Sequence, residues 1–230
     1  MSTQTDATLV EPPLAPVRVG VVDDEPMART FVTRILASAP EIEVVAEAAD
    51  GAGALELVRT QSPDVLLLDL RMPGMDGLDT LRELRRAHKR PAVVVLTTFH
   101  ADEAVATALN LGATGFLLKH TDPTELVRAV RLAARGDSVL DPALTKELMG
   151  HLATHHLDRI GASSQVARLS NRLRDVLRLI GAGRSNAEIA EDLRLSESTV
   201  RGYVSEILAA TGCANRVTAA VLAQRSGLLG

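Results

Sequence analysis

Residues 17–138 alternate five times between a short apolar segment and a longer amphipathic segment, and this alternation restricts the fold more than any other feature. The apolar segments have the length and composition of strands buried on both faces, and the amphipathic ones have the spacing of a helix face. Strands that alternate with helices build right-handed crossover units, which gives a doubly wound α/β domain with a five-stranded parallel sheet. The expected strands are 17–22, 42–47, 64–69, 92–97 and 115–118, and the expected helices are 27–38, 51–60, 77–88, 101–111 and 122–135.

Acidic residues stand at the ends of two of these expected strands. The third strand closes on Asp69, shortly before a turn that contains Pro73 and Gly74, and the first strand is followed by Asp23 and Asp24. In an open parallel sheet the functional crevice lies beyond the carboxyl ends of the strands. Carboxylates from two strand ends could therefore converge on one divalent cation.

Residues 166–230 carry helical signals alone and predict a small all-α domain. Ser185 and Glu188 form a capping-box pattern that opens one short helix, and Ser196 stands where the next helix begins. From Val200 onward, the apolar positions of that second helix point inward and leave polar side chains on its outer face. Two short helices with this arrangement are typical of a helix–turn–helix that enters the major groove of duplex DNA.

The remaining sequence separates the two domains, which also differ in charge. The proline-rich residues 1–16 predict a disordered lead-in, and residues 139–165 predict a linker with a short helix. Residues 1–150 carry 15 basic and 22 acidic side chains, whereas residues 166–230 carry nine basic and six acidic ones. An acidic first part and a mildly basic last part suit different partners.

Composition excludes several classes of function. Aromatic residues make up 2% of the chain, too few for the stacking platform of a protein that binds RNA or single strands. The single cysteine, Cys213, cannot form an internal disulfide. The sequence contains neither an apolar run near eighteen residues nor a basic and then apolar N-terminus, so we expect a cytoplasmic protein with no membrane contact.

Four motifs in the first domain resemble the receiver domain of two-component response regulators. They read VVDDEP at 21–26, LDLRMPGMDG at 68–77, VLTTF at 95–99 and GATGFLLK at 112–119. The resemblance implies a flavodoxin-like fold in which Asp69 accepts a phosphoryl group from a sensor histidine kinase. It further implies that Mg²⁺ is held by Asp23, Asp24, Asp69 and the backbone carbonyl of Arg71, that Thr97 and Lys119 act in catalysis, and that Thr97 and Phe116 form the switch.

These residue types suit the transfer of a phosphoryl group to a carboxylate. A carboxylate can attack phosphorus to give an acyl phosphate, and catalysis then consists mainly of positioning and of neutralising charge on the phosphoryl oxygens. That neutralisation is supplied by a divalent cation with oxygen ligands, by the ammonium of Lys119 and by the hydroxyl of Thr97. The chain departs from the family at His120, which follows Lys119 where proline is usual.

The helix–turn–helix resembles the LuxR-type DNA-binding domain through SNAEIA at residues 185–190 and LSESTVR at residues 195–201. Together with the receiver, it makes the chain similar to response regulators of the NarL/FixJ family. The resemblance implies a dimerising helix over residues 214–224. It also implies that Arg201, Gly202 and Ser205 face bases and that Ser196 and Thr199 face the phosphate backbone. Glu206 departs from the family, because it places an acid next to the DNA, one turn beyond Arg201.

The sequence therefore predicts a transcriptional regulator that a histidine kinase phosphorylates on Asp69 and that then dimerises and binds duplex DNA. It is not expected to be an enzyme, apart from slow loss of its own phosphoryl group. Two alternatives stay open: a phosphatase that forms an aspartyl phosphate during turnover, and a receiver-based interaction protein that does not bind DNA. Haloacid-dehalogenase-like phosphatases place their nucleophile after the first strand, whereas Asp69 follows the third.

Overall fold

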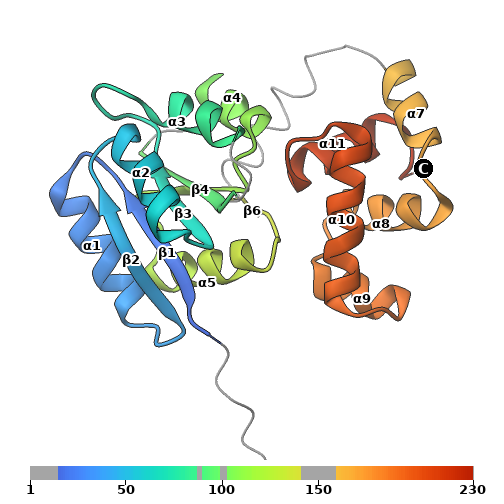
Figure 1. Cartoon of the computed structure of the whole chain (residues 1–230). Coiled ribbons are helices and arrows are strands. Elements are labelled where there is room, and N and C mark those ends of the chain that lie inside the picture. Colours follow the sequence, from blue (N-terminus) through green and yellow to red (C-terminus); the bar gives the residue numbers. More distant parts are fainter. Residues whose placement is uncertain (1–14, 87–89, 99–102, 141–158, 230) are drawn as a thin grey trace, which may run out of the picture.

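The computed structural model describes residues 15–86, 90–98, 103–140 and 159–229. Residues 1–14 of the expected lead-in and 141–158 of the expected linker lie outside this part. An N-terminal α/β domain and a C-terminal helical domain lie side by side (Figure 1). No helix in the described ranges is both long and apolar enough to cross a membrane.

The α/β domain is built on a parallel sheet with the strand order β2-β1-β3-β4-β5-β6. The five expected strands are confirmed as β1 (Val17–Val22), β2 (Ile42–Ala48), β3 (Val65–Asp69), β4 (Ala92–Thr97) and β5 (Gly115–Leu118). A short sixth strand, β6 (Val139–Leu140), pairs with β5 at the sheet edge and was not predicted, since two residues cannot form an apolar pattern. Gly115 permits this pairing, because a Cβ there would lie 2.7 Å from the carbonyl oxygen of Val139.

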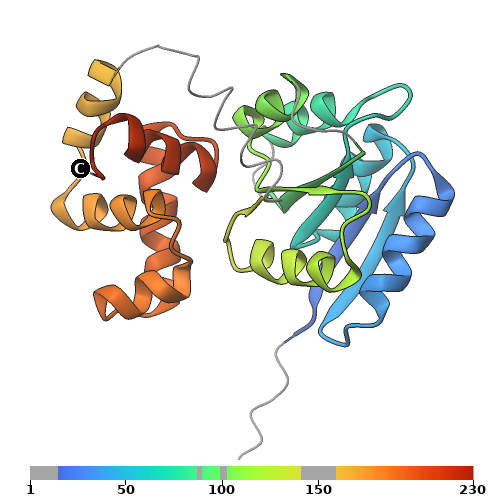
Figure 2. The same ribbon diagram turned by 180° about the vertical axis from the view of Figure 1, so that it is seen from behind.

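Helices cover both faces of this sheet, as the two opposite views show (Figures 1 and 2). One face is covered by α1 (Pro26–Ala37) and α5 (Pro123–Ala134), and the other by α2 (Gly51–Gln61), α3 (Gly77–Leu84) and α4 (Glu103–Leu111). Side chains alternate along β3, so Leu66 and Leu68 join the layer of α2, α3 and α4, while Val65 and Leu67 join the layer of α1 and α5. Both faces are apolar, which explains why the strands read as unbroken apolar runs.

Helix α3 is shorter than predicted. It ends at Leu84 and is followed by the cap residue Arg85, whose N–H donates to the carbonyl of Leu81, whereas the sequence predicted a helix through residue 88. Arg85 and Arg86 are exposed, and residues 87–89 lie outside the described part. Beyond Leu84 the charged side chains are not buried in the core, so the spacing of apolar residues does not show where the helix ends.

The C-terminal domain is helical, as predicted, and encloses its own apolar core. Its helices are α7 (Arg159–Ala167), α8 (Asn171–Gly181), α9 (Asn186–Leu193), α10 (Glu197–Thr211) and α11 (Arg216–Arg225). Leu177, Ile189 and Ile207 are fully buried in this core and tie α8, α9 and α10 together. Helix α7 begins inside the expected linker, and its Val166 also belongs to the core.

Helices α9 and α10 form the predicted helix–turn–helix. The capping box of α9 is confirmed, because Ser185 accepts a hydrogen bond from the N–H of Glu188 while Glu188 accepts one from the N–H of Ser185. Between the helices, Arg194 adopts a left-handed conformation with φ of 54°. Ser196 then caps α10 by accepting a hydrogen bond from the N–H of Thr199.

Candidate phosphorylation site and DNA-binding helix

Three carboxylates converge at the carboxyl edge of the sheet, as the sequence predicted. Asp69 ends β3, and Asp23 and Asp24 follow β1. Each of the three offers a carboxylate oxygen, and these oxygens lie within 4.8 Å of one another. Asp23 and Asp69 are buried, with 2% and 5% of their surface exposed, whereas Asp24 is exposed. The cluster therefore opens to solvent on the side of Asp24.

The backbone around Asp69 fixes the direction of its side chain. The N–H of Arg71 donates to Oδ1 of Asp69 at 3.1 Å, which leaves Oδ2 turned toward the cluster. The turn after β3 packs closely, because a Cβ on Gly77 would lie 2.3 Å from the carbonyl oxygen of Asp69. Asp23 is fixed in a similar way, since its Oδ1 accepts a hydrogen bond from the N–H of Glu25 at 2.9 Å.

Lys119 places its ammonium between the two buried carboxylates. Its Nζ lies 2.6 Å from Oδ2 of Asp23 and 2.7 Å from Oδ2 of Asp69. Burial lowers the pKa of Lys119, but the hydrogen bonds and negative charges of Asp23 and Asp69 outweigh burial and raise the pKa above its ordinary value. The side chain thus stays charged and balances two carboxylates that would otherwise repel each other.

Thr97 and Phe116 lie on the two strands next to the acidic cluster. Thr97 ends β4, and its carbonyl accepts a hydrogen bond from the N–H of Lys119 at 2.8 Å, so the ends of β4 and β5 are joined. Phe116 lies within β5 and is fully buried in the core layer that α4 covers. The peptide between Lys119 and His120 is trans.

The donor set of the cluster suits a hard divalent cation. Carboxylate oxygens are the side-chain ligands that Mg²⁺ prefers, and Asp23, Asp24 and Asp69 supply three of them at one point. The ammonium of Lys119 contacts two of the same carboxylates. A cation bound here and Lys119 would share the negative charge of the cluster.

The second predicted site is the outer face of α10. Arg201, Gly202, Ser205 and Glu206 are exposed, while Val200, Val204 and Ile207 are buried in the core as predicted. Ser205 donates its hydroxyl to the carbonyl of Arg201 at 3.0 Å, and the guanidinium of Arg201 lies 3.8 Å from the carboxylate of Glu197. The face therefore presents one arginine, one glycine and short polar groups beside the acid Glu206.

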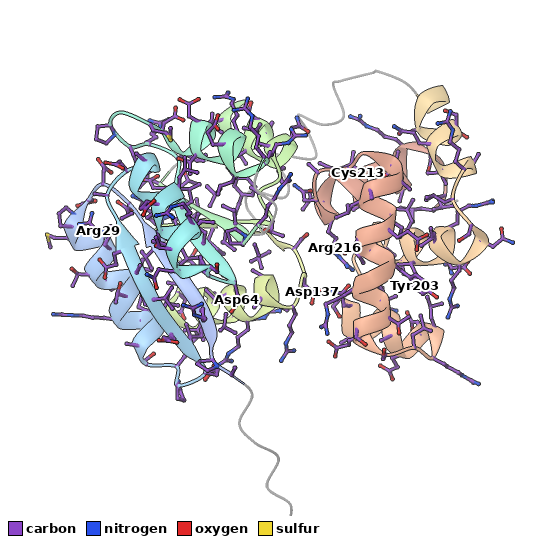
Figure 3. All side chains as sticks on the ribbon, in the orientation of Figure 1. Arg29, Asp64, Asp137, Tyr203, Cys213 and Arg216 are labelled. Atoms are coloured by element: carbon purple, nitrogen blue, oxygen red, sulfur yellow. The ribbon has the colours of Figure 1, made fainter. Side chains whose placement is uncertain are left out.

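Sequence reasoning did not predict the polar contacts that join the two domains. Asp137 of the first domain binds the N-terminus of α9 at Asn186, and Asn215, the cap of α11, binds carbonyl groups at the end of α4. Arg216 lies at the same boundary and is labelled together with Asp137 in Figure 3. These residues come from distant parts of the sequence, so no local pattern could have paired them.

Comparison with known proteins assigns both domains. The response regulator receiver domain matches residues 19–131, and the bacterial regulatory proteins of the luxR family match residues 167–223. The chain is 41% identical to the nitrate/nitrite response regulator protein NarL of Escherichia coli (strain K12) over 206 residues, which are 90% of this chain and 94% of that one. It is also 41% identical to the probable transcriptional regulatory protein NarL of Mycobacterium tuberculosis (strain ATCC 25618 / H37Rv), over 93% of this chain and 96% of the relative.

A solved structure with the same domain order supports this assignment. The response regulator ChrA of a heme-sensing two-component system matches with a TM-score of 0.52 and 32% sequence identity. The match covers 94% of this chain and 100% of that one, so both domains take part in it. The chain belongs to the NarL/FixJ family of response regulators, transcriptional regulators that join a receiver domain to a LuxR-type DNA-binding domain.

Proposed function

We propose that a sensor histidine kinase phosphorylates this regulator on Asp69, with Mg²⁺ as cofactor, and that the phosphorylated chain dimerises and binds duplex DNA. The observation that carries the proposal is the convergence of three carboxylates within 4.8 Å beside the ammonium of Lys119. We assign Mg²⁺ to Asp23, Asp24, Asp69 and the backbone carbonyl of Arg71, because hard oxygen donors suit this ion. When bound, Mg²⁺ reduces the repulsion between phosphoryl oxygens and the carboxylates.

Asp69 is the nucleophile of the proposed reaction. Its Oδ1 is engaged by the N–H of Arg71, so we assign the attack on phosphorus to Oδ2, which faces Lys119. A new P–O bond replaces the P–N bond of a phosphohistidine, and the imidazole nitrogen leaves with the electron pair. Lys119 then exchanges its contact with Oδ2 for one with a phosphoryl oxygen, which neutralises charge where it is created.

Thr97 and Phe116 are assigned to the response that follows. We assign the hydroxyl of Thr97, at the end of β4, to a phosphoryl oxygen. The backbone hydrogen bond from the N–H of Lys119 to the carbonyl of Thr97 joins the two residues, so we expect them to move together. Phe116 lies under α4, so a change at the end of β4 reaches the helix that contacts the DNA-binding domain. Phosphorylation changes the charge at Asp69 from −1 to about −2, and this change supplies the free energy for the response.

The other assignments follow from the two domains. We assign residues 1–16 to a lead-in, 17–138 to the receiver, 139–165 to a linker and 166–230 to the DNA-binding domain. On α10 we assign Arg201, Gly202 and Ser205 to contacts with bases. We assign Ser196 and Thr199 to contacts with the phosphate backbone, and we place Glu206 at the edge of this DNA-contacting face. Transcriptional regulators act where the chromosome is, so we place the protein in the cytoplasm. We also expect the acyl phosphate on Asp69 to be lost slowly by hydrolysis.

The experiment that tests this proposal is intact-mass measurement after incubation with Mg²⁺ and a small phosphodonor. The wild-type chain is expected to gain the mass of one phosphoryl group, and Asp69→Asn is expected to gain none while it keeps its circular dichroism spectrum. Binding of genomic DNA fragments should then increase on phosphorylation of the wild type. Full phosphorylation of the Asp69→Asn chain would contradict the assignment of the acceptor.

A further inference from the structure

The first turn of α2 packs against the loop that follows the strand of Asp69. Helices α2 and α3 are neighbours on one face of the sheet (Figure 1). Gly51, the first residue of α2, is buried, and its N–H donates to the carbonyl of Met75 at 3.0 Å. The first N–H groups of a helix have no partner within the helix, so this one can hold another segment. The segment that it holds is the loop between Asp69 and α3.

A side chain at position 51 has no room. A Cβ built on Gly51 would lie 2.2 Å from Oγ1 of Thr80, 2.6 Å from Cγ of Met75 and 2.7 Å from the carbonyl oxygen of Met75. Real Cβ atoms essentially never lie closer than 3.0 Å to such neighbours. The last of these three contacts is with the backbone, and no side-chain rotation can relieve it. Any residue other than glycine must therefore displace the loop or the start of α3 from α2.

The start of α3 transmits this contact to Asp69. Thr80 is fully buried, and its hydroxyl donates to the carbonyl of Asp76 at 2.7 Å, just before α3 begins at Gly77. A Cβ built on Gly77 would lie 2.3 Å from the carbonyl oxygen of Asp69. The N–H of Gly77 also donates to the carbonyl of Leu70 at 3.1 Å. The start of α3 therefore lies between the first turn of α2 and the backbone of Asp69, in close contact with both.

The loop held by α2 carries groups that the proposed reaction needs. The N–H of Arg71 donates to Oδ1 of Asp69 at 3.1 Å, and the carbonyl of Arg71 is the one assigned to Mg²⁺. A displacement of Met75 or of the start of α3 therefore reaches both the carboxylate that is phosphorylated and a carbonyl that binds the cation. Residues that orient the ligands of a metal typically change its affinity about 10- to 100-fold when they are replaced.

We propose that Gly51 is a positioning residue for phosphoryl transfer to Asp69. The absence of a side chain lets the first turn of α2 hold the carbonyl of Met75 and support the start of α3. This support fixes Asp69 and the carbonyl of Arg71 in the positions from which both bind Mg²⁺. The proposal rests on the proposed function and deepens it. Gly51 acts through the loop and is not itself assigned to the cation or to the phosphoryl group.

The first test measures Mg²⁺ binding to the full-length chain by calorimetry, without a phosphodonor. Gly51→Ala is expected to raise the dissociation constant of Mg²⁺ about tenfold, because it displaces the loop that carries a ligand. The matched control Gly53→Ala adds the same methyl group to the same turn of α2, where the nearest atom is Cβ of Ala48 at 3.1 Å rather than the loop. This control should leave the constant nearly unchanged. An unchanged constant in folded Gly51→Ala, or equal increases in both variants, would overturn the proposal.

A second variant keeps the test decisive if Gly51→Ala does not fold. Thr80→Ala removes Oγ1, the atom nearest to the new methyl group, and leaves the carbonyl of Met75 in place. The double variant Gly51→Ala/Thr80→Ala is compared with Thr80→Ala alone, and thermal unfolding followed by circular dichroism checks that both fold. The double variant is expected to bind Mg²⁺ more weakly, because the contact with the backbone remains. Equal Mg²⁺ affinities of these two chains would overturn the proposal.

Amide hydrogen exchange tests the contact itself, with neither Mg²⁺ nor a phosphodonor present. In the wild type, the N–H of Gly51 is expected to exchange slowly, because it donates to the carbonyl of Met75. In Gly51→Ala, the N–H of residue 51 should exchange faster, since the loop has moved away from α2. Exchange in the wild type at the rate of an unprotected amide would overturn the proposal.

Phosphorylation rates separate this inference from the proposed function. With a small phosphodonor, the Mg²⁺ concentration that gives half of the maximal rate is expected to rise about tenfold in Gly51→Ala, and excess Mg²⁺ should restore most of the rate. A lower rate with an unchanged half-maximal Mg²⁺ concentration would show that Gly51 contributes to stability alone, and it would overturn the proposal. A wild-type chain that gains no phosphoryl group at any Mg²⁺ concentration would instead contradict the proposed function. The Mg²⁺ affinities and exchange rates would then still decide whether Gly51 positions the loop.

Discussion

At the scale of single residues, the site depends on how charge is balanced among Asp23, Asp69 and Lys119. Two carboxylates at 3% and 8% side-chain exposure would repel each other without a cation, and Lys119 lies within 2.7 Å of both. Mg²⁺ bound to the cluster would take over part of this role, since it would share the same carboxylates. The stability of the receiver should therefore depend on Lys119 most strongly when Mg²⁺ is absent.

Replacing Lys119 by methionine tests this balance. Without Mg²⁺, Lys119→Met is expected to lower the free energy of unfolding by about 1–3 kcal/mol, because it leaves buried carboxylates unpaired. Added Mg²⁺ should restore more stability to this variant than to the wild type, as urea denaturation would show. The control is Arg128→Met, which removes an exposed pair with Glu125 and should cost less than about 1 kcal/mol. Equal losses in the two variants would contradict the expectation.

The acidic part of this site could be predicted because it depends on local rules. An apolar strand that ends on an acid, in a parallel sheet, places that acid at the edge where other strands also end. The positions of Asp23 and Asp69 are confirmed on this basis. The contact of Lys119 with both acids depends on side-chain directions at the ends of three different strands, and no spacing in the sequence encodes those directions.

At the scale of the element, α10 carries an unusual residue in Gly202. A Cβ built there meets no atom within 4 Å, so alanine fits without strain. Gly202→Ala is expected to raise the free energy of unfolding by about 0.5–1 kcal/mol, because glycine is a poor helix former. Thermal unfolding measures this gain, and DNA binding measures whether the backbone needs to approach a base closely. A loss of stability would show that the helix does not tolerate a side chain at this position.

Glu206 on the same face should weaken DNA binding. The residue is exposed on α10 one turn beyond Arg201, so we expect its carboxylate to lie near the DNA backbone and to repel phosphate. Glu206→Arg is expected to tighten binding to all sequences and to steepen the salt slope by roughly 1–2, since one negative charge is replaced by a positive one. The control Asp175→Arg makes the same charge change at an exposed position of α8. An unchanged slope with lost discrimination at one base pair would show instead that Glu206 reads a cytosine.

The elements themselves were largely predictable, with differences at their ends. Strands and helices that bury an apolar face have a period that the sequence displays, so β1 to β5 and the helix–turn–helix are confirmed close to their expected bounds. The end of α3 was wrong because Arg85 and Arg86 are exposed and carry no periodic signal. The strand β6 was missed because its two residues are too few to show an apolar pattern, and they form a strand only by pairing with β5.

At the scale of the whole molecule, phosphorylation is expected to change the oligomeric state. A phosphoryl group with a charge of about −2 beside Thr97 and Lys119 is expected to change the conformation of the receiver surface around Phe116 and α4. We expect this altered surface to form a two-fold dimer, because closed two-fold dimers are the commonest assemblies. Light scattering should show a monomer for the untreated chain and twice that mass with beryllofluoride. Asp69→Asn serves as the control and should remain monomeric. The same mass for the wild type with and without beryllofluoride would contradict the prediction.

The arrangement of the two domains could not be predicted from the sequence. Asn215 looks like an ordinary helix cap, and it does cap α11 by accepting a hydrogen bond from the N–H of Thr218 at 2.8 Å. The structure gives it a second task, since its Nδ2 donates to the carbonyl of Leu109 at 2.7 Å and to that of Ala113 at 2.8 Å, at the end of α4. Backbone carbonyls at a helix end exist in every sequence, so nothing marks these two as its partners.

A single substitution separates the two tasks of Asn215. Aspartate caps a helix as well as asparagine does, but it has no donor, and its charge would face the carbonyls of Leu109 and Ala113. Asn215→Asp is therefore expected to keep the thermal stability of α11 while it weakens the contact between the receiver and the DNA-binding domain. Scattering should show a larger radius of gyration, and the unphosphorylated chain should bind random duplex about tenfold more tightly. Asn171→Asp makes the same chemical change at the exposed start of α8, and it should alter neither the radius of gyration nor the affinity for the duplex. If Asn215→Asp also alters neither, the bonds from Asn215 to the end of α4 do not hold the receiver against the DNA-binding domain.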